Sequence, residues 1–135
     1  MSGDDIADRP QPRDLADRAA ESIRALNHLT PDALEYPGDL YDVIARLKVM
    51  AQRLPQLFGQ LSAWLELEYA AGRIAHDSGQ APERYVKGVT DSLTLAAMGG
   101  SALADALDTA HNACSGLKAA HPGAEDRPAE RAGGS

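Results

Sequence analysis

Two long stretches of this sequence repeat apolar residues at alternating spacings of three and four. The first ladder comprises Leu40, Val43, Leu47, Met50, Leu54, Leu57, Leu61 and Trp64. The second ladder comprises Val86, Val89, Leu93, Ala96, Gly100, Leu103, Leu107, Ala110, Cys114 and Leu117. Because this spacing places every member on one side of an α-helix, each stretch is predicted to form a long helix with one buried seam.

The polar segment His76–Pro82 separates the two ladders and predicts a reversal of the chain. Gly79 favours a turn, and Pro82 suits the first position of the following helix. We therefore expect an antiparallel helical hairpin folded about Gly79, with helices over residues 40–75 and 82–119.

Two breaks in the helical pattern need an explanation. Pro55 lies inside the first helix, where its ring and missing N–H group predict a kink or a break. In the register expected here, Phe58 lies beside Gly99 and Gly100, and the two glycines leave room for its ring.

The first long helix carries more apolar surface than one neighbour can cover. Ile44, Ala51, Phe58 and Leu65 flank its ladder and widen the stripe. Either the short amphipathic helix expected over residues 14–28 packs there, or a second copy of the chain does.

The composition favours helices throughout. The chain has 135 residues, of which 44% are hydrophobic and only 4% aromatic, so the core must use aliphatic and alanine side chains. We predict an all-α fold, a long antiparallel hairpin plus a short N-terminal helix, forming a three-helix bundle, or a four-helix bundle on dimerisation. The expected domain covers residues 14–119, with disordered tails over 1–13 and 120–135.

The net charge of −7 and the scattered bases argue against direct nucleic-acid binding. No stretch approaches the 18 apolar residues of a membrane span, and residues 1–12 lack the apolar core of an export signal. Cys114 is the only cysteine, which excludes an intramolecular disulfide, and its ladder position predicts burial. A cytoplasmic location is expected.

Residues able to support chemistry are sparse. Asp108 and His111 have the spacing of a metal-binding pair, with His28 as a third ligand, but no second pair exists on the first long helix. Glu68 is the single candidate for acid–base catalysis, and an ion pair with Arg84 or Lys87 is the simpler expectation. No catalytic residue, metal site or cofactor is predicted.

Large aromatic side chains are the best candidates for contact with a partner, because they dominate interface energetics. The chain offers five of them: Tyr36, Tyr41, Trp64, Tyr69 and Tyr85. Tyr69 and Tyr85 flank the expected hairpin tip, and Tyr36 and Tyr41 gather at its open end. The alternative is that each ring only covers an end of the bundle.

The sequences of residues 34–43, 52–57, 64–65 and 74–77 resemble a group of small, alanine-rich actinomycete helical proteins of uncharacterised function. The similarity covers about residues 20–118 and implies no active site. In size and hairpin form only, the chain is also similar to the helical-hairpin substrates of type VII secretion. It departs from them at Trp64, which lacks the glycine two residues later.

These observations predict a non-enzymatic helical-bundle protein that acts by binding other proteins. One version of this prediction is a homodimer joined through the first long helix. Two alternatives stay open. One is a secreted helical hairpin of the type VII kind. The other is a small ligand-binding bundle or enzyme with a site near Glu68 or Asp108.

Overall fold

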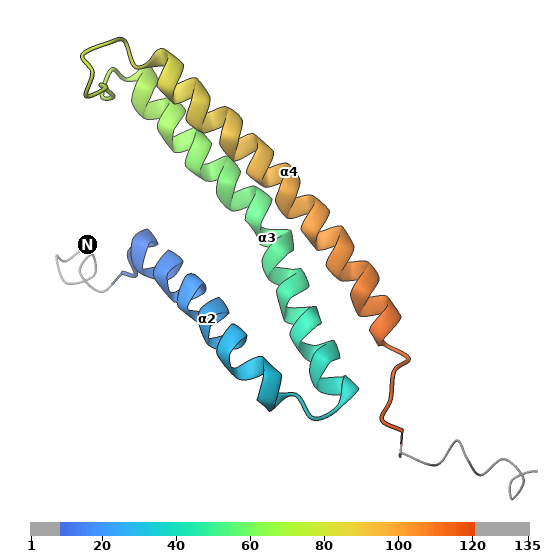
Figure 1. The fold of residues 1–135 in the computed structure, drawn as a ribbon. Helices are drawn as coiled ribbons and strands as arrows, with labels where there is room; N and C mark the ends of the chain where they lie inside the picture. The colour runs from blue at the N-terminus through green and yellow to red at the C-terminus, as the bar shows by residue number, and fades with distance from the viewer. Residues whose placement is uncertain (1–8, 121–135) are drawn as a thin grey trace, which may run out of the picture. The chain divides into compact units, whose positions relative to one another are not determined.

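The computed structural model describes residues 9–120, which contain three helices (Figure 1). These are α2 (Pro12–Ala33), α3 (Pro37–Ala70) and α4 (Glu83–Cys114). No strand occurs in this part of the chain, so the predicted all-α class is confirmed. The chain divides into two compact units between Glu35 and Tyr36, and each unit is described by itself.

The first unit is built on α2, which is longer than the predicted helix over residues 14–28. Pro12 occupies the first turn, where its missing N–H group costs nothing, and Pro31 is accommodated near the other end. Residues 12 and 13, expected in a tail, are therefore helical. The remainder of the two predicted tails lies largely outside the described residues.

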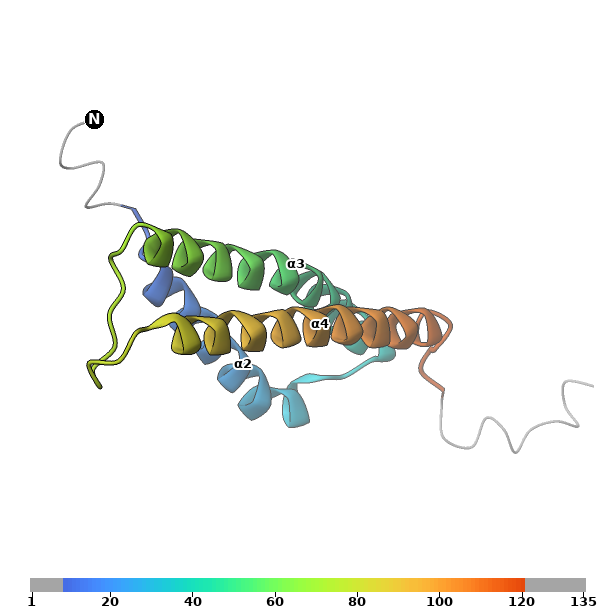
Figure 2. The ribbon, with the colours of Figure 1, turned by 90° about the horizontal axis from the view of Figure 1, so that it is seen from above.

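The second unit is the predicted antiparallel hairpin of α3 and α4, which lie side by side in both views (Figures 1 and 2). Helix α3 begins at Pro37, three residues before the predicted start. Asp39 therefore sits at the third helical position, where its Oδ2 accepts a hydrogen bond of 3.0 Å from the Tyr36 amide. This contact satisfies a donor that the helix start leaves free.

Helix α3 ends at Ala70, five residues before the predicted end. Gly72 adopts a left-handed conformation with φ of 76°. Its N–H donates to the Tyr69 carbonyl, and the Arg73 N–H donates to the Glu68 carbonyl, both at 3.0 Å. This Schellman arrangement closes the helix with its last carbonyls satisfied.

The register of the hairpin differs from the prediction by about one helical turn. A Cβ atom on Gly100 would lie 3.2 Å from Leu54 Cβ and 3.3 Å from Pro55 Cδ. Gly100 therefore faces these two residues instead of Phe58, and a Cβ on Gly99 would meet nothing within 4 Å. The reason is the early end of α3, which moves the centre of the reversal from Gly79 to about residue 76 or 77.

Pro55 does not break the helix. Helix α3 is continuous from Pro37 to Ala70, and the Pro55 ring packs against the backbone of Gly100. Of the two expected outcomes, a kink or a break, the break is therefore absent.

The first ladder faces α4 only in its first half. Its half-buried members are Val43, Leu47, Met50 and Leu54. Leu40, at the start of the ladder, and Leu57, Leu61 and Trp64 are exposed, which contradicts the predicted seam. In their place the half-buried residues are one position further along the chain: Phe58, Ser62, Leu65 and Tyr69.

The second ladder is also correct in part. Its buried members are Val86, Gly100 and Cys114, and Leu93, Ala96, Leu107 and Ala110 are half-buried. Val89, Leu103 and Leu117 are exposed, against the prediction. Helix α4 ends at Cys114, five residues early, so Leu117 lies beyond the helix.

Candidate interaction surface

The hairpin has two sides of opposite character, one apolar and one polar. When two antiparallel helices pack, the residues that precede the facing positions lie on one side of the pair on both helices. The residues that follow the facing positions lie on the other side. The facing positions are fixed by the burial pattern and by the contact of Gly100 with Leu54 and Pro55.

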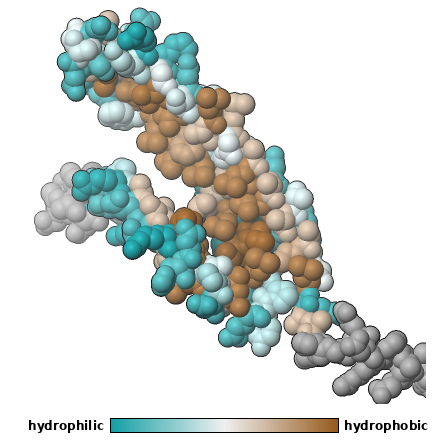
Figure 3. Space-filling model, viewed as in Figure 1, coloured by the Kyte–Doolittle hydropathy of each residue, from teal (hydrophilic) through white to brown (hydrophobic). Residues whose placement is uncertain are grey.

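The apolar side combines the misplaced members of both ladders. We define the apolar face as the six exposed residues on this side: Leu40, Leu57, Leu61 and Trp64 of α3, and Val89 and Leu103 of α4. Their exposed fractions lie between 39% and 61%. Figure 3 shows apolar surface running along the hairpin. Exposed apolar surface of this length is typical of a protein-binding site.

The opposite side of the hairpin is polar. Its exposed residues include Asp42, Gln52, Gln56 and Glu66 of α3, and Lys87, Asp91, Asp105 and Asp108 of α4. Lys87 Nζ lies 2.7 Å from Asp91 Oδ2, and this hydrogen bond and the Asp91 charge raise the pKa of Lys87. Lys48 Nζ reaches Asp108 Oδ1 at 3.1 Å. The six residues that define the apolar face carry no charge, and Arg53 and Glu68 continue the row of Leu57, Leu61 and Trp64 at its two ends.

A small groove of about 130 Å³ lies at the hairpin tip. It is lined by Leu65, Ile74, Ala75, His76, Pro82, Tyr85, Val86 and Val89. The rings of His76 and Tyr85 stack with centroids 3.5 Å apart, and the Ser78 amide donates to His76 Nδ1 at 3.1 Å. These contacts hold the loop that forms one wall of the groove.

The five candidate aromatic residues fall at the two ends of the hairpin. Tyr36 and Trp64 are exposed, whereas Tyr69 is half-buried. Tyr41 is half-buried and stacks on His111 with ring centroids 4.1 Å apart. Tyr85 lines the tip groove. The five rings do not form one cluster, and Trp64 is the one that belongs to the apolar face.

Glu68 is paired, although not with the expected partner. Its two carboxylate oxygens accept hydrogen bonds from Arg73 Nε at 2.7 Å and Nη2 at 3.1 Å. The prediction that it reaches Arg84 or Lys87 is therefore wrong. Arg73 lies five residues away at the end of α3, and its bond to Glu68 raises the pKa of the Arg73 guanidinium.

Asp108 and His111, which have the spacing of a metal-binding pair but were not predicted to bind a metal, have separate contacts. Asp108 is engaged with Lys48, and His111 Nε2 is buried without a hydrogen-bond partner beside Tyr41. Within residues 9–120 no group of three His, Cys, Asp or Glu side chains is placed to hold a metal ion. Cys114 is buried, as predicted, with Sγ 3.9 Å from the Pro37 carbonyl oxygen.

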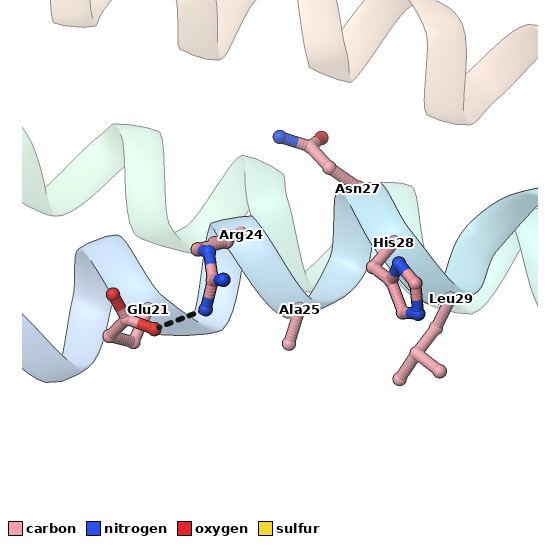
Figure 4. Close-up of a pocket in the computed structure, with 6 residues that line it drawn as sticks. All are labelled: Glu21, Arg24, Ala25, Asn27, His28 and Leu29. Atoms are coloured by element: carbon pink, nitrogen blue, oxygen red, sulfur yellow. Dashed lines mark hydrogen bonds and ion pairs between the residues drawn. The ribbon is translucent and has the colours of Figure 1, made fainter.

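Helix α2 carries a separate hollow, lined by residues of this helix alone (Figure 4). Glu21 and Arg24 form an ion pair of 3.2 Å, and Asn27 points away from Ala25, His28 and Leu29. The surface of one helix is convex, so these six side chains alone do not enclose a ligand.

None of the helices in the described part of the chain combines the length and the apolar character that crossing a bilayer requires. Comparisons with protein-family models, curated proteins and solved structures found no match to this chain.

The wide apolar stripe of α3 predicted a second neighbour, but the prediction placed the ladder, and not the flanking row, against α4. In α3, two apolar rows run side by side at the same spacing, one beginning at Leu40 and the other at Ile44. Two such rows on one helix indicate two buried neighbours. The tip groove had no comparable signal, because the loop wall with Ile74 and His76 depends on where α3 ends.

Proposed function

We propose that this protein acts by binding another protein through the apolar face of its hairpin and has no catalytic role. The observation that carries the proposal is the row Leu57, Leu61 and Trp64, which lies at helical spacing and is exposed. Leaving these side chains in water costs roughly 25 cal/mol for each Å² of apolar surface. A protein partner that covers the row would recover this free energy.

The arrangement of polar groups supports binding over catalysis. Glu68 is neutralised by Arg73, and Asp108 is paired with Lys48. The tip groove is shallow and mainly apolar, with no converging carboxylates or nucleophile. The proposal invokes no cofactor and no nucleic acid.

Partner and location belong to the same proposal. A second copy of the chain is among the candidate partners, so the proposal includes a homodimer. The burial of Cys114, the only cysteine, suits a reducing cytoplasm. We also propose that the chain is related to the alanine-rich actinomycete proteins that it resembles. This relationship does not identify a binding partner.

A capture experiment with matched variants tests the function. Leu61→Glu places a charge on the apolar face, and Met98→Glu makes the same change at an apolar residue on the polar side that is more exposed, at 64% against 47%. We expect immobilised full-length protein to retain a partner from native cytosol that Leu61→Glu loses and Met98→Glu keeps. The purified partner should then bind with affinity reduced about tenfold or more by Leu61→Glu alone. Equal retention by all three proteins, or none by any, would contradict the proposal.

A further inference from the structure

The hairpin buries too little apolar surface to explain how two helices of this length are stable on their own. Within the described residues, the buried hydrophobic residues are Ala51, Val86, Ala104 and Cys114, and no large side chain is fully buried. A core of this size rarely supplies more than about 3–5 kcal/mol. A further layer must cover the apolar face.

We infer that this layer is a second copy of the same hairpin, which completes a four-helix bundle; this inference rests on the proposed function. In such a bundle every helix buries two adjacent stripes. Helix α3 has one stripe toward α4 and a second on the apolar face. Helix α4 shares its seam with α3 and presents Val89, Ala96 and Leu103 on the same side.

The size of the face suits a stable dimer. From Leu40 to Trp64 the face runs 24 residues, or about 36 Å at 1.5 Å per residue. Two packed helices are about 20 Å wide. The face therefore covers about 700 Å² per copy, close to the 800 Å² per partner of a standard interface.

The length of the face also favours a second hairpin over α2. The large apolar residues of α2 extend from Leu15 to Leu29, which is 14 residues or about 21 Å. Wherever α2 lies, this span is shorter than the 36 Å of the apolar face. A second copy of the hairpin has an apolar face of the same length.

The tip supplies complementary shapes on one face. Trp64 projects from α3 with 61% of its surface exposed. Val89 and Tyr85, on the same side of α4, line the tip groove. A two-fold axis along the hairpin sets α3 of one copy against α4 of the other with both tips at one end. Trp64 of each copy then lies level with the groove of its partner, an isologous contact made twice.

Trp64 is the only tryptophan, so its fluorescence reports this contact directly. We expect the full-length protein to have twice the mass of one chain by light scattering at about 100 µM, a concentration at which an interface of this size is populated. On dilution the mass should fall and the Trp64 emission should shift to longer wavelength together. Leu61→Glu should weaken dimerisation about tenfold or more, and Met98→Glu should not. Circular dichroism checks that both variants keep their helices.

A mixing experiment separates contact between copies from contact within one chain. Val89→Glu should shift the Trp64 emission to longer wavelength, because the groove is altered. Adding an excess of Trp64→Phe, which has no tryptophan and an intact groove, should move the emission back toward shorter wavelength. Adding the double variant Trp64→Phe, Val89→Glu should have no effect.

The alternatives give different results. A monomer at every concentration overturns the inference, whether Trp64 is shielded by its own chain or open to solvent. A dimer in which Trp64→Phe fails to restore the emission of Val89→Glu overturns the tip contact. A monomer that still captures a partner dependent on Leu61 refutes the second copy and leaves the proposed function standing.

Discussion

Close approach of α3 and α4 depends on one residue, Gly100. Its backbone lies against Leu54 and Pro55, at distances that leave a side chain almost no room. Pro55 removes one backbone hydrogen bond from α3, and its ring occupies space that a side chain at position 100 would need. The pair Pro55 and Gly100 therefore forms a local fit between the two helices.

Replacing Gly100 with leucine should destabilise the fold by about 1–3 kcal/mol, because the added side chain would overlap Leu54 and Pro55. Gly88→Leu is the matched control, since a side chain there meets nothing within 4 Å. Gly88→Leu should be neutral or stabilise by up to about 1 kcal/mol through helix propensity. Urea unfolding at one protein concentration measures both changes. Equal midpoints for the two variants would contradict the close contact at Gly100.

At the residue scale, the sequence correctly predicted the burial of some ladder members and not of others. Cys114 was expected in the core and is 5% exposed. Trp64, Leu57 and Leu61 were expected in the seam and are exposed, since the same heptad spacing describes their row and the neighbouring one. The sequence could not choose between two rows that differ by a rotation of about 100°.

Among the elements, the end of α3 decides the register of the hairpin. Gly72, in the left-handed conformation, lets the chain turn away after Ala70. Residues 71–75, expected as helix, lie beyond it, and Ile74 and Ala75 line the tip groove beside His76. One helix terminus thus shapes both the pairing and the candidate site.

Gly72→Ala should destabilise the protein by about 1–2 kcal/mol, because an L-residue resists a φ of 76°. Gly59→Ala is the matched change inside α3, where a Cβ meets nothing within 4 Å. It should stabilise by up to about 1 kcal/mol. Thermal unfolding followed by circular dichroism measures the two opposite changes in stability. A stabilised Gly72→Ala would mean that α3 continues past Ala70.

Helix type was predictable because it depends on local spacing. The two long helices follow from their three-and-four repeats, and the short helix follows from the amphipathic segment after Asp14. Helix ends were less accurately predicted, with errors of one to five residues. Ala71–Gly72 was a readable stop signal, but the apolar residue Ile74 beyond it suggested that the helix continued.

For the whole molecule, the apolar face implies that stability depends on protein concentration. If two hairpins share one core, unfolding also separates the copies. A tenfold dilution then removes about 1.4 kcal/mol per mole of dimer. We expect the melting temperature to fall by about 3 °C for each tenfold dilution.

Leu61→Glu provides the control for this dependence. Its melting temperature should be lower than that of the wild type, and unchanged by dilution at concentrations where light scattering shows the variant to be monomeric. Met98→Glu should retain the dependence, since Met98 lies on the polar side. A wild-type melting temperature that is constant over a hundredfold range would exclude a shared core.

By itself the sequence determined that this chain is helical, that its two long helices reverse at a polar break, and that its cysteine is buried. Each of these follows from interactions between residues near in sequence or from a strict repeat. Only the tertiary structure decided which of two adjacent rows faces the partner helix, because both rows satisfy the same spacing. That choice depends on contacts between residues such as Leu54 and Gly100, 46 positions apart, and it leaves Leu57, Leu61 and Trp64 exposed on the apolar face.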